Sequence, residues 1–406
     1  MGQPAWIIIG NPESRPVALF QAALARCGLP PARIVAYADL LAHNITLCDV
    51  VQDGDIVRIE TPGRNFAVEI ALLQRGVDAI DPETLAYAHA SAHWLNQVLA
   101  QHAHDRGAVW YPRQWYLGYC ALLQEIAQQL AACPPHRRMN QPNDIEHMFD
   151  KRQCHARLAQ AGMLVPRSPG PIQGYADLLA AMQQMGWHQV FVKLAHGSSA
   201  SGSVAYRTNG QQHRAVTTVD TISYDPAGYP ILFNTRRLRT LHDRAEIATL
   251  IDAVCQHRAH VEQWLPKAGI DGATFDLRVV MIAGQVCHVV PRLSNTPMTN
   301  LHLLNRRGNI DRVRQRMGET AWQALCQHCQ QVMTLFPGSL YAGLDVLLLP
   351  GYHQHVILEC NAFGDLLPGM LWHGMDTYEA EIVAMLKSHG EPLHEPGRGH
   401  TYRQQW

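Results

Sequence analysis

The feature that most constrains the fold is a pair of strand-like segments near the C-terminus, Tyr341–Leu349 and His355–Asn361, joined by a short turn. A turn centred on Tyr352 would place Asp345 directly opposite Glu359. Side chains alternate between the faces of a strand, and directly opposed residues share a face. One face of the predicted hairpin is then suited to a core, because it carries only Leu344, Val346, Leu348, Val356, Leu358 and Cys360.

The other face collects candidate metal ligands. Asp345 and Glu359 meet there, and Asn361 lies opposite Gly343, whose missing side chain leaves room. Neighbouring carboxylates repel each other unless a cation or a proton separates them. Oxygen ligands of this kind suit Mg²⁺, which takes one or two carboxylates and completes its shell with water and phosphate. The alternative is an ordinary amphipathic hairpin whose acidic residues face solvent.

Lysine is rare in this chain, with four residues beside 29 arginines. One of them, Lys193, lies in Val190–Leu194, a segment too apolar to be a routine surface strand. Small residues follow it and would offer backbone N–H groups and hydroxyls to an anion: Gly197, Ser198, Ser199, Ala200, Ser201 and Gly202. The sequence has neither a Walker A loop nor Gly-x-Gly-x-x-Gly here. A phosphate-binding loop is predicted, with a flexible surface loop as the alternative.

Strand, helix and proline patterns predict the domain organisation. A strand–helix–strand rhythm beginning at Trp6–Ile9 is typical of a small α/β layer. Prolines at 112, 134, 135 and 142 mark a linker around one helix. We therefore expect an N-terminal α/β domain over 1–110, a helical linker over 111–142, a central lobe with the phosphate-covering loop over 143–265, a C-terminal lobe with the metal site over 266–388, and a tail over 389–406.

Composition excludes several classes of partner. The formal net charge is −1 and the pI is about 7.1, which argues against a general nucleic-acid or membrane surface. The apolar runs are strand-sized, and the first residues lack the pattern of a secretory signal. Ten cysteines without a framework spacing are expected to be free thiols. We therefore expect a cytoplasmic protein. The sequence does not indicate an oligomeric state.

Eight short motifs follow one another in a set order: Asp150-Lys151, Phe191-Val192-Lys193 with its small-residue loop, Val261-Glu262-Gln263, Asp276-Leu277-Arg278, Arg292, Asn300, Gly343-Leu344-Asp345 and Glu359-Cys360-Asn361. Their order resembles the signature of the ATP-grasp superfamily, in particular its glutathione synthetase-like and D-alanine–D-alanine ligase-like branch. The resemblance covers roughly residues 145–370. It implies a mixed α/β and α+β fold, with a small pre-ATP-grasp-like α/β domain before a two-lobed ATP-grasp domain of antiparallel sheets.

The resemblance also implies a role for each matched position. Lys151 and Lys193 would contact the ATP phosphates, under a lid formed by Gly197, Ser198, Ser199 and Gly202. The adenine hinge would be Glu262, Gln263, Trp264 and Leu265, and the Mg²⁺ ligands would be Asp345, Glu359 and Asn361. Arg278 and Arg292 would stabilise the transferring phosphoryl group, with Asn300 nearby. A Gly-Gly pair that often follows the asparagine in the family is absent, because Leu301-His302 stands there.

The implied activity is ATP-dependent ligation of a carboxylate to an amine through an acyl phosphate, with ATP and Mg²⁺ as cofactors. The acceptor would be an amino acid, a peptide or a similar small molecule. An ATP-grasp kinase that phosphorylates a hydroxyl is one alternative, and a non-catalytic nucleotide-binding regulator is another.

Several weaker candidates lie outside these motifs. Arg58 and Arg64 flank the end of a predicted N-terminal strand and could recognise a substrate carboxylate. Cys326 and Cys329 are expected to be packed thiols rather than half of a zinc site. His353 and His355 are expected to be solvated beside the hairpin turn. The basic run Asn234–Arg244 could bind an acidic ligand or simply face solvent.

Overall fold

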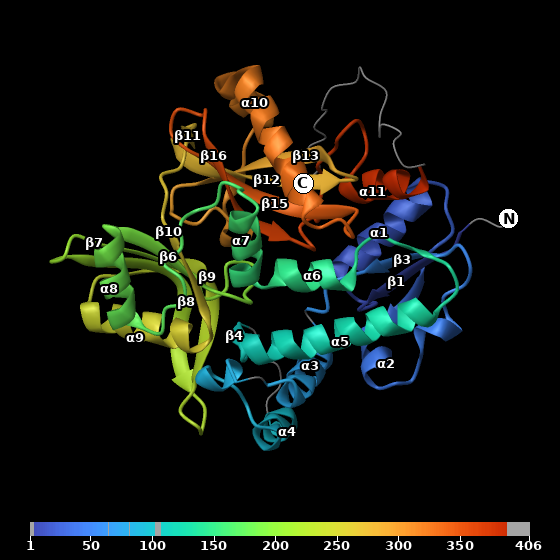
Figure 1. Ribbon diagram of the computed structural model, residues 1–406, viewed down its shortest axis with the longest axis horizontal. Coiled ribbons are helices and arrows are strands. Elements are labelled where there is room, and N and C mark those ends of the chain that lie inside the picture. The colour runs from blue at the N-terminus through green and yellow to red at the C-terminus, as the bar shows by residue number, and fades with distance from the viewer. Residues whose placement is uncertain (1–3, 64, 81, 102–106, 388–406) are drawn as a thin grey trace.

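The computed structural model describes residues 4–63, 65–80, 82–101 and 107–387 (Figure 1). An N-terminal parallel sheet has the order β2-β1-β3-β5. Its strands are β1 (Trp6–Gly10), β2 (Arg33–Ala36), β3 (Ile56–Ile59) and β5 (Arg137–Arg138). The accompanying helices are α1 (Arg15–Arg26), α2 (Tyr37–Leu41), α3 (Phe66–Asp78) and α4 (Ala92–Gln101). The predicted α/β layer is confirmed.

The predicted linker is built largely from one helix, α5 (Pro112–Ala132). It crosses α3 at close range, because a Cβ on Gly118 would lie 1.9 Å from the carbonyl oxygen of Leu72. Residues beyond the helix return to the N-terminal sheet as β5. In the other direction, β4 (Ala108–Val109) pairs with a strand of the central lobe. Both segments therefore tie the linker region into the neighbouring sheets.

The central lobe is an antiparallel sheet with the order β10-β6-β7-β8-β9-β4. Its elements are α6 (Pro142–Phe149), α7 (Lys151–Gln160), α8 (Tyr175–Met185), β6 (Gln189–Leu194), β7 (Val204–Thr208), β8 (His213–Tyr224), β9 (Pro230–Leu241), α9 (Arg244–Gln256) and β10 (Ala259–Gln263). Val190, Val192 and Leu194 pack in one core with α8 and α9, which lie beside this sheet in Figure 1. Because side chains alternate along a strand, Phe191 and Lys193 face the other way.

The C-terminal lobe has the strand order β14-β13-β12-β15-β16, with β11 paired to β12. Its elements are β11 (Gly269–Ile270), β12 (Ala273–Ile282), β13 (Gln285–Ser294), β14 (Arg306–Arg307), α10 (Ile310–Thr334), β15 (Tyr341–Leu348), β16 (His355–Asn361) and α11 (Thr377–Leu386). Apolar residues of α10 pack with Leu277, Val279 and Leu344 on one face of this sheet. The opposite face carries the polar residues of the predicted site.

The register of the C-terminal hairpin is confirmed at one end and wrong at the other. Asp345 is paired with Glu359 and Gly343 with Asn361, as predicted. A bulge then shifts the pairing, so that Val346 lies opposite Ile357. Ile357, rather than Leu358 or Val356, therefore joins the core with Leu344, Val346, Leu348 and Cys360. The bulge keeps Asp345, Glu359 and Asn361 on the polar face and still gives the hairpin an apolar face.

The N-terminal unit and the C-terminal lobe share apolar cores. One cluster of buried residues includes Ile9 and Tyr119 together with Phe275 of the C-terminal lobe. A second contains both Phe20 and Tyr341. The sheet of the central lobe has a core of its own with α8 and α9, whereas α6 and α7 pack in the first cluster. The fold is therefore a joined N- and C-terminal body, which includes α6 and α7, with a separately packed central sheet.

Arg58 links the two halves of that body. It is fully buried on β3, and its guanidinium lies 2.6 Å from Glu60, 2.6 Å from Asp365 and 2.5 Å from Glu381 of α11. Three aromatic rings lie within 4.4–5.1 Å of the guanidinium carbon and belong to Phe20, Tyr341 and Tyr378. The prediction that Arg58 binds a substrate carboxylate is therefore wrong for this structure, because protein carboxylates already occupy the guanidinium.

We expect Arg58→Met to lower the free energy of unfolding by about 3–5 kcal/mol, because it leaves buried carboxylates without their cation. The measurement is urea denaturation of the variant and the wild type at pH 7. Arg26→Met is the matched control, because Arg26 also pairs with two carboxylates of this region but is 46% exposed. A loss no larger than that of Arg26→Met would contradict the structural role of Arg58.

The same cluster predicts a pH dependence. Burial raises the pKa of Glu381 well above its ordinary value of 4.5, although Arg58 acts to lower it. A carboxyl group with a raised pKa binds more protons in the folded state, so its contribution to stability is lost as pH rises from 4.5 through the folded pKa. Glu381→Gln cannot ionise and should flatten this decline. Equal pH slopes for the variant and the wild type would contradict the assignment.

Candidate functional site

The polar face of the C-terminal sheet carries a row of directly opposed charges. Arg278 on β12 is paired with Asp345 on β15, which is paired in turn with Glu359 on β16. Asp276 and Arg292 are opposed in the same way on β12 and β13. The sheet register therefore brings predicted phosphoryl-binding arginines and predicted metal ligands together.

Asp345 lies between two arginines and is 4% exposed. Arg278 Nε is 2.8 Å from Oδ1, and an Arg292 Nη atom is 2.9 Å from Oδ2. Oδ1 nevertheless has no partner in hydrogen-bond geometry. Burial raises the pKa of Asp345, and the nearby Glu359 adds to that rise, while Arg278 and Arg292 oppose it. A further cation would be favourable at this carboxylate.

Glu359 faces the cations of the central lobe. Lys151 Nζ lies 3.3 Å from its carboxylate. Burial acts to raise the pKa of Glu359, but Lys151, Lys193 and Arg278 hold it well below its usual range. Asn361 is half-buried opposite Gly343, to whose carbonyl its Nδ2 donates over 3.3 Å. Two carboxylates and an amide oxygen on one face are a donor set that fits Mg²⁺.

Lys193 and Glu262 form a buried ion pair on the facing sheet. Burial acts to raise the pKa of Glu262, but Lys193 and then His260 lower it to about 2. Burial acts to lower the pKa of Lys193, but Glu262 and Glu359 raise it overall. The Glu262 carboxylate, predicted to face adenine, thus holds a predicted phosphate ligand in place. Its second oxygen is buried without a hydrogen bond, 3.6 Å from His260 Nε2.

The rest of the predicted hinge lies at the end of β10. The backbone N–H of Gln263 donates to Arg167 over 2.8 Å, and that of Trp264 donates to Gln189 over 3.3 Å. Adenine could use these two donors only by displacing the protein acceptors. Leu265 is half-buried beside them. The Trp264 ring lies 5.2 Å from that of Phe191, in an apolar cluster with Ala205, Val216, Leu238, Met298 and Leu303.

The predicted phosphate loop follows β6 and is held at both ends. Lys151 Nζ donates to the carbonyl of Gly197 over 2.7 Å, and the backbone N–H of Gly202 donates to Asn234 over 3.0 Å. Ser198 and Ser199 are exposed between them. Ser199 adopts a φ of 52°, a left-handed conformation that costs about 1–3 kcal/mol in a residue other than glycine. Hydroxyls and strained backbone are therefore exposed beside Lys151.

Sequence reasoning missed Lys267. Its side chain is 7% exposed, and Nζ lies 3.0 Å from the Thr299 hydroxyl and 3.8 Å from Asp276. Asp276 also accepts two bonds from Arg292, at 2.7 and 2.8 Å. Burial lowers the pKa of Lys267, and Asp276 opposes that shift. The rarity of lysine could have indicated that Lys267 belongs to the site, because three of the four lysines, Lys151, Lys193 and Lys267, converge here.

The remaining candidates are placed as follows. Asn300 is half-buried before the 3-10 turn Leu301–Leu303, and its carbonyl accepts from Leu303 and Asn305. Arg64 lies outside the described residues. The described cysteines are free, and no group of three or more His, Cys, Asp or Glu in the described ranges could hold a metal. Cys326 and Cys329 pack within α10, as expected.

Two predictions about the surface have different outcomes. His353 is exposed, but His355 is buried and its Nε2 lies 2.9 Å from Nδ1 of His328, so the expectation of solvent for His355 is wrong. The bulge in β16 turns this residue toward α10. On β9, Arg236 and Arg237 are exposed, and Arg239 pairs with Glu246 at 2.8 Å.

A small cavity lies between the lobes. Lys151, Lys193, Glu262 and Glu359 line a cavity of only about 10 Å³, together with residues of α7. That volume is close to the minimum for one water molecule. A hollow of about 740 Å³ lies elsewhere, beside Gly269–Thr274 and Arg316. A ligand larger than a water molecule would therefore need this cavity to widen.

The chain is similar in structure to several solved proteins. No protein-family model matches the chain, and the comparison with curated proteins gives no match. D-cycloserine synthetase DcsG is similar in structure over 94% of this chain and 100% of its own, with a TM-score of 0.52 and 10% identity. The ADP complex of PurK, an N5-carboxyaminoimidazole ribonucleotide synthetase, matches over 95% and 77%, with a TM-score of 0.53 and 12% identity. The ATP-grasp ligase PsnB, complexed with a phosphomimetic variant of minimal precursor, Mg and ADP, matches over 95% and 98%, with a TM-score of 0.48 and 14% identity.

This chain has the ATP-grasp fold. The fold implied by the order of the motifs is therefore confirmed over nearly the whole chain. Within the ATP-grasp fold, the charges described above lie where the two lobes face each other. In the described residues, no helix has the length and apolar character needed to cross a membrane.

The Lys193–Glu262 pair gives a test of structural coupling. Lys193→Met should lower the free energy of unfolding by about 3–5 kcal/mol, because the buried Glu262 carboxylate loses its cation. The double variant Lys193→Met/Glu262→Gln should recover most of this loss. Urea denaturation of the wild type and all three variants measures the coupling. Additive effects of the two substitutions would contradict a direct pair.

Proposed function

We propose that this protein is an ATP-dependent carboxylate–amine ligase that uses Mg²⁺ and releases ADP and phosphate. The observation that carries the proposal is the convergence of charge between the lobes. Five cations, Lys151, Lys193, Lys267, Arg278 and Arg292, meet four carboxylates, Glu262, Asp276, Asp345 and Glu359. Such a cluster suits a triphosphate and a divalent cation better than a neutral ligand.

Each part of the cluster can take one part of Mg·ATP. Lys151 and Lys193 would bind the phosphates, under the loop from Gly197 to Gly202. Asp345, Glu359 and Asn361 would hold Mg²⁺, which neutralises phosphate charge when bound. The apolar cluster around Phe191 and Trp264 would hold the adenine ring. Arg278 and Arg292 would then release Asp345 and stabilise the phosphoryl group as it transfers.

Names of the similar structures favour ligation over the alternatives. DcsG and PurK are both named synthetases, and PurK is an ADP complex. A ligase transfers the γ-phosphoryl group to a carboxylate, and an amine then displaces phosphate from the acyl phosphate. A kinase would stop after phosphorylating a hydroxyl. A regulator would bind nucleotide without turnover. An amino acid, a peptide or a similar small acceptor remains our proposal for the substrate.

We also propose the domain boundaries predicted above and a cytoplasmic location. The free cysteines support the location, because disulfides are rare in reducing compartments. Asn300 is proposed to contact substrate or phosphate, since the adjacent Thr299 bonds with Asp276. Arg64 remains a proposed substrate ligand.

We expect ADP and phosphate to form only when a carboxylate and an amine substrate are both present. A closed site excludes water, which would otherwise accept the phosphoryl group. Phosphate release, measured with each substrate omitted in turn, distinguishes this ligase from a kinase. Formation of AMP and pyrophosphate would contradict the acyl-phosphate route.

Glu359→Gln should lower turnover by on the order of 10²-fold or more, as loss of other preorganised electrostatic contacts does. The substitution removes a metal-ligand charge at nearly constant volume, while the lysines still bind ATP. The exposed Glu246→Gln is the control and should turn over like the wild type. Equal rates for Glu359→Gln and the wild type would contradict its metal role.

A further inference from the structure

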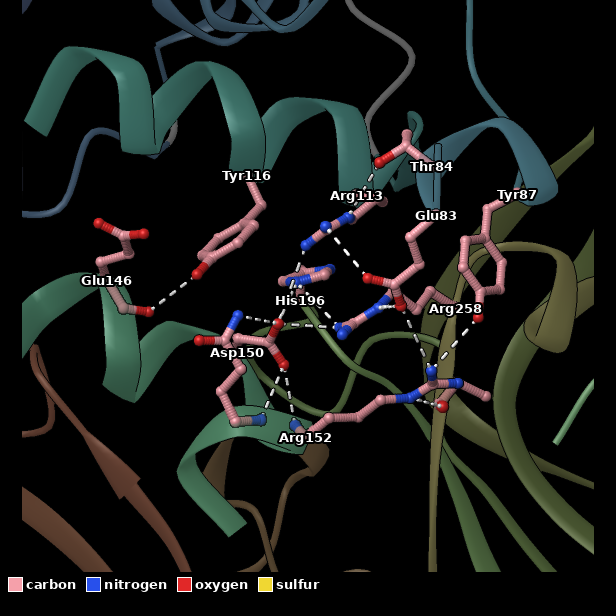
Figure 2. Close-up of polar contacts among 12 residues, drawn as sticks. Glu83, Thr84, Tyr87, Arg113, Tyr116, Glu146, Asp150, Arg152, His196 and Arg258 are labelled. Atoms are coloured by element: carbon pink, nitrogen blue, oxygen red, sulfur yellow. Dashed lines mark hydrogen bonds and ion pairs between the residues drawn. The ribbon is translucent and has the colours of Figure 1, made fainter. Parts of the chain in front are cut away.

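A second cluster of arginines surrounds Asp150 and Glu83, near His196, the residue before the phosphate loop (Figure 2). Arg113 comes from α5, Arg152 from α7 and Arg258 from the turn after α9. Their side chains are only 5%, 13% and 6% exposed. Burying three guanidinium groups together is costly unless anions compensate them.

Two carboxylates face these arginines, and they differ in accessibility. Asp150 is completely buried and lies 2.9 Å from Arg258 and 3.1 Å from His196. Glu83 is 46% exposed and lies 2.8 Å from Arg258, 3.5 Å from Arg113 and 3.8 Å from Arg152. Figure 2 shows the Glu83 carboxylate pointing into the group of arginines. Glu83 therefore closes the cluster from the solvent side.

The charge balance shows what Glu83 contributes. The three arginines carry three positive charges, and the carboxylates of Asp150 and Glu83 lie 2.8–3.9 Å from them. Burial lowers the pKa of His196 to about 4, although Asp150 opposes that shift, so its imidazole adds no charge at pH 7. Removing Glu83 would therefore take one negative charge away from these buried guanidinium groups. In addition, a terminal nitrogen of Arg152 and Nδ1 of the buried His196 have no hydrogen-bond partner.

Glu83 is also easily moved. It precedes a 3-10 turn of three residues, Thr84–Ala86, and the neighbouring Leu85 is 63% exposed. Thr84 stays buried and accepts a bond from Arg113, so the backbone is anchored next to the glutamate. Rotation of the Glu83 side chain toward solvent would uncover the arginines without unfolding the turn.

We propose that Arg113, Arg152 and Arg258 form a binding site for the carboxylate of a ligand, and that Glu83 occupies this site until the ligand displaces it. The present occupant is itself a carboxylate, which indicates the ligand class. Asp150 connects the site to the phosphate loop, because it also accepts from the backbone of Arg152 and lies beside Lys151. The site does not depend on the activity proposed above.

The test is chemical rescue of Glu83→Ala. The variant should melt at a lower temperature than the wild type, and sodium acetate should restore the melting temperature more than sodium chloride of equal ionic strength. Its apparent affinity for acetate should exceed that of the wild type at least tenfold. Adding Arg152→Met to Glu83→Ala should abolish the rescue. Glu83→Gln, which keeps the side-chain volume, serves for the same titration if the alanine variant does not fold.

Glu246→Ala is the matched control, because Glu246 is 48% exposed and pairs with Arg239 at 2.8 Å on the surface. Acetate and chloride should act on it alike. Rescue of Glu83→Ala by triglycine, but not by triglycinamide, would extend the ligand class to peptide termini. If sodium chloride restored the melting temperature of Glu83→Ala as well as sodium acetate does, the effect would be ionic screening and the proposal would be overturned. Absence of rescue, or rescue by inorganic phosphate alone, would overturn the carboxylate assignment.

Discussion

The buried pairing of Asp345 with Arg278 and Arg292 is the interaction on which the site depends. Charges placed this deep are stable only when they compensate one another. The two arginines hold Asp345 on one side, and Glu359 meets Lys151 across the lobes. The lysines and arginines therefore compensate the carboxylates, as a bound metal ion would. A ligand can enter only by exchanging these partners.

The small cavity between the lobes lies where some of these charges meet. Lys151, which we assign to phosphate, now lies 3.3 Å from the carboxylate of Glu359, which we assign to Mg²⁺, and both line a cavity of about 10 Å³. The central sheet has its own core with α8 and α9, whereas the N-terminal unit and the C-terminal lobe share theirs and are joined by Arg58. Opening at the boundary of the central sheet would separate Lys193 from Glu359 and would also part the small apolar cluster that Phe191 and Trp264 share with Met298 and Leu303.

Local patterns in the sequence were sufficient for much of the fold and of the site. The alternation of apolar and polar residues along the last hairpin predicted that Asp345 lies opposite Glu359, because the pairing register determines the face on which each side chain lies. The bulge after Asp345 was not predictable, since the choice of Ile357 over Leu358 for the core depends on packing against α10. Long-range pairing likewise determined the role of Arg58, whose partners Asp365 and Glu381 are about 300 residues away. The place of Lys267 in the site could not be predicted from local patterns either, because its partner Thr299 lies on a distant loop.

The measurement that tests the account most directly is the coupling between ATP and Mg²⁺ in calorimetric titrations of the wild type. ATP draws lysine and arginine away from Asp345 and Glu359, which then require another cation. Each ligand should therefore raise the affinity of the other by the same factor, at least tenfold after correction for the Mg·ATP complex in solution. ATP affinity that is independent of Mg²⁺, or the absence of ATP binding, would contradict the exchange of charge partners.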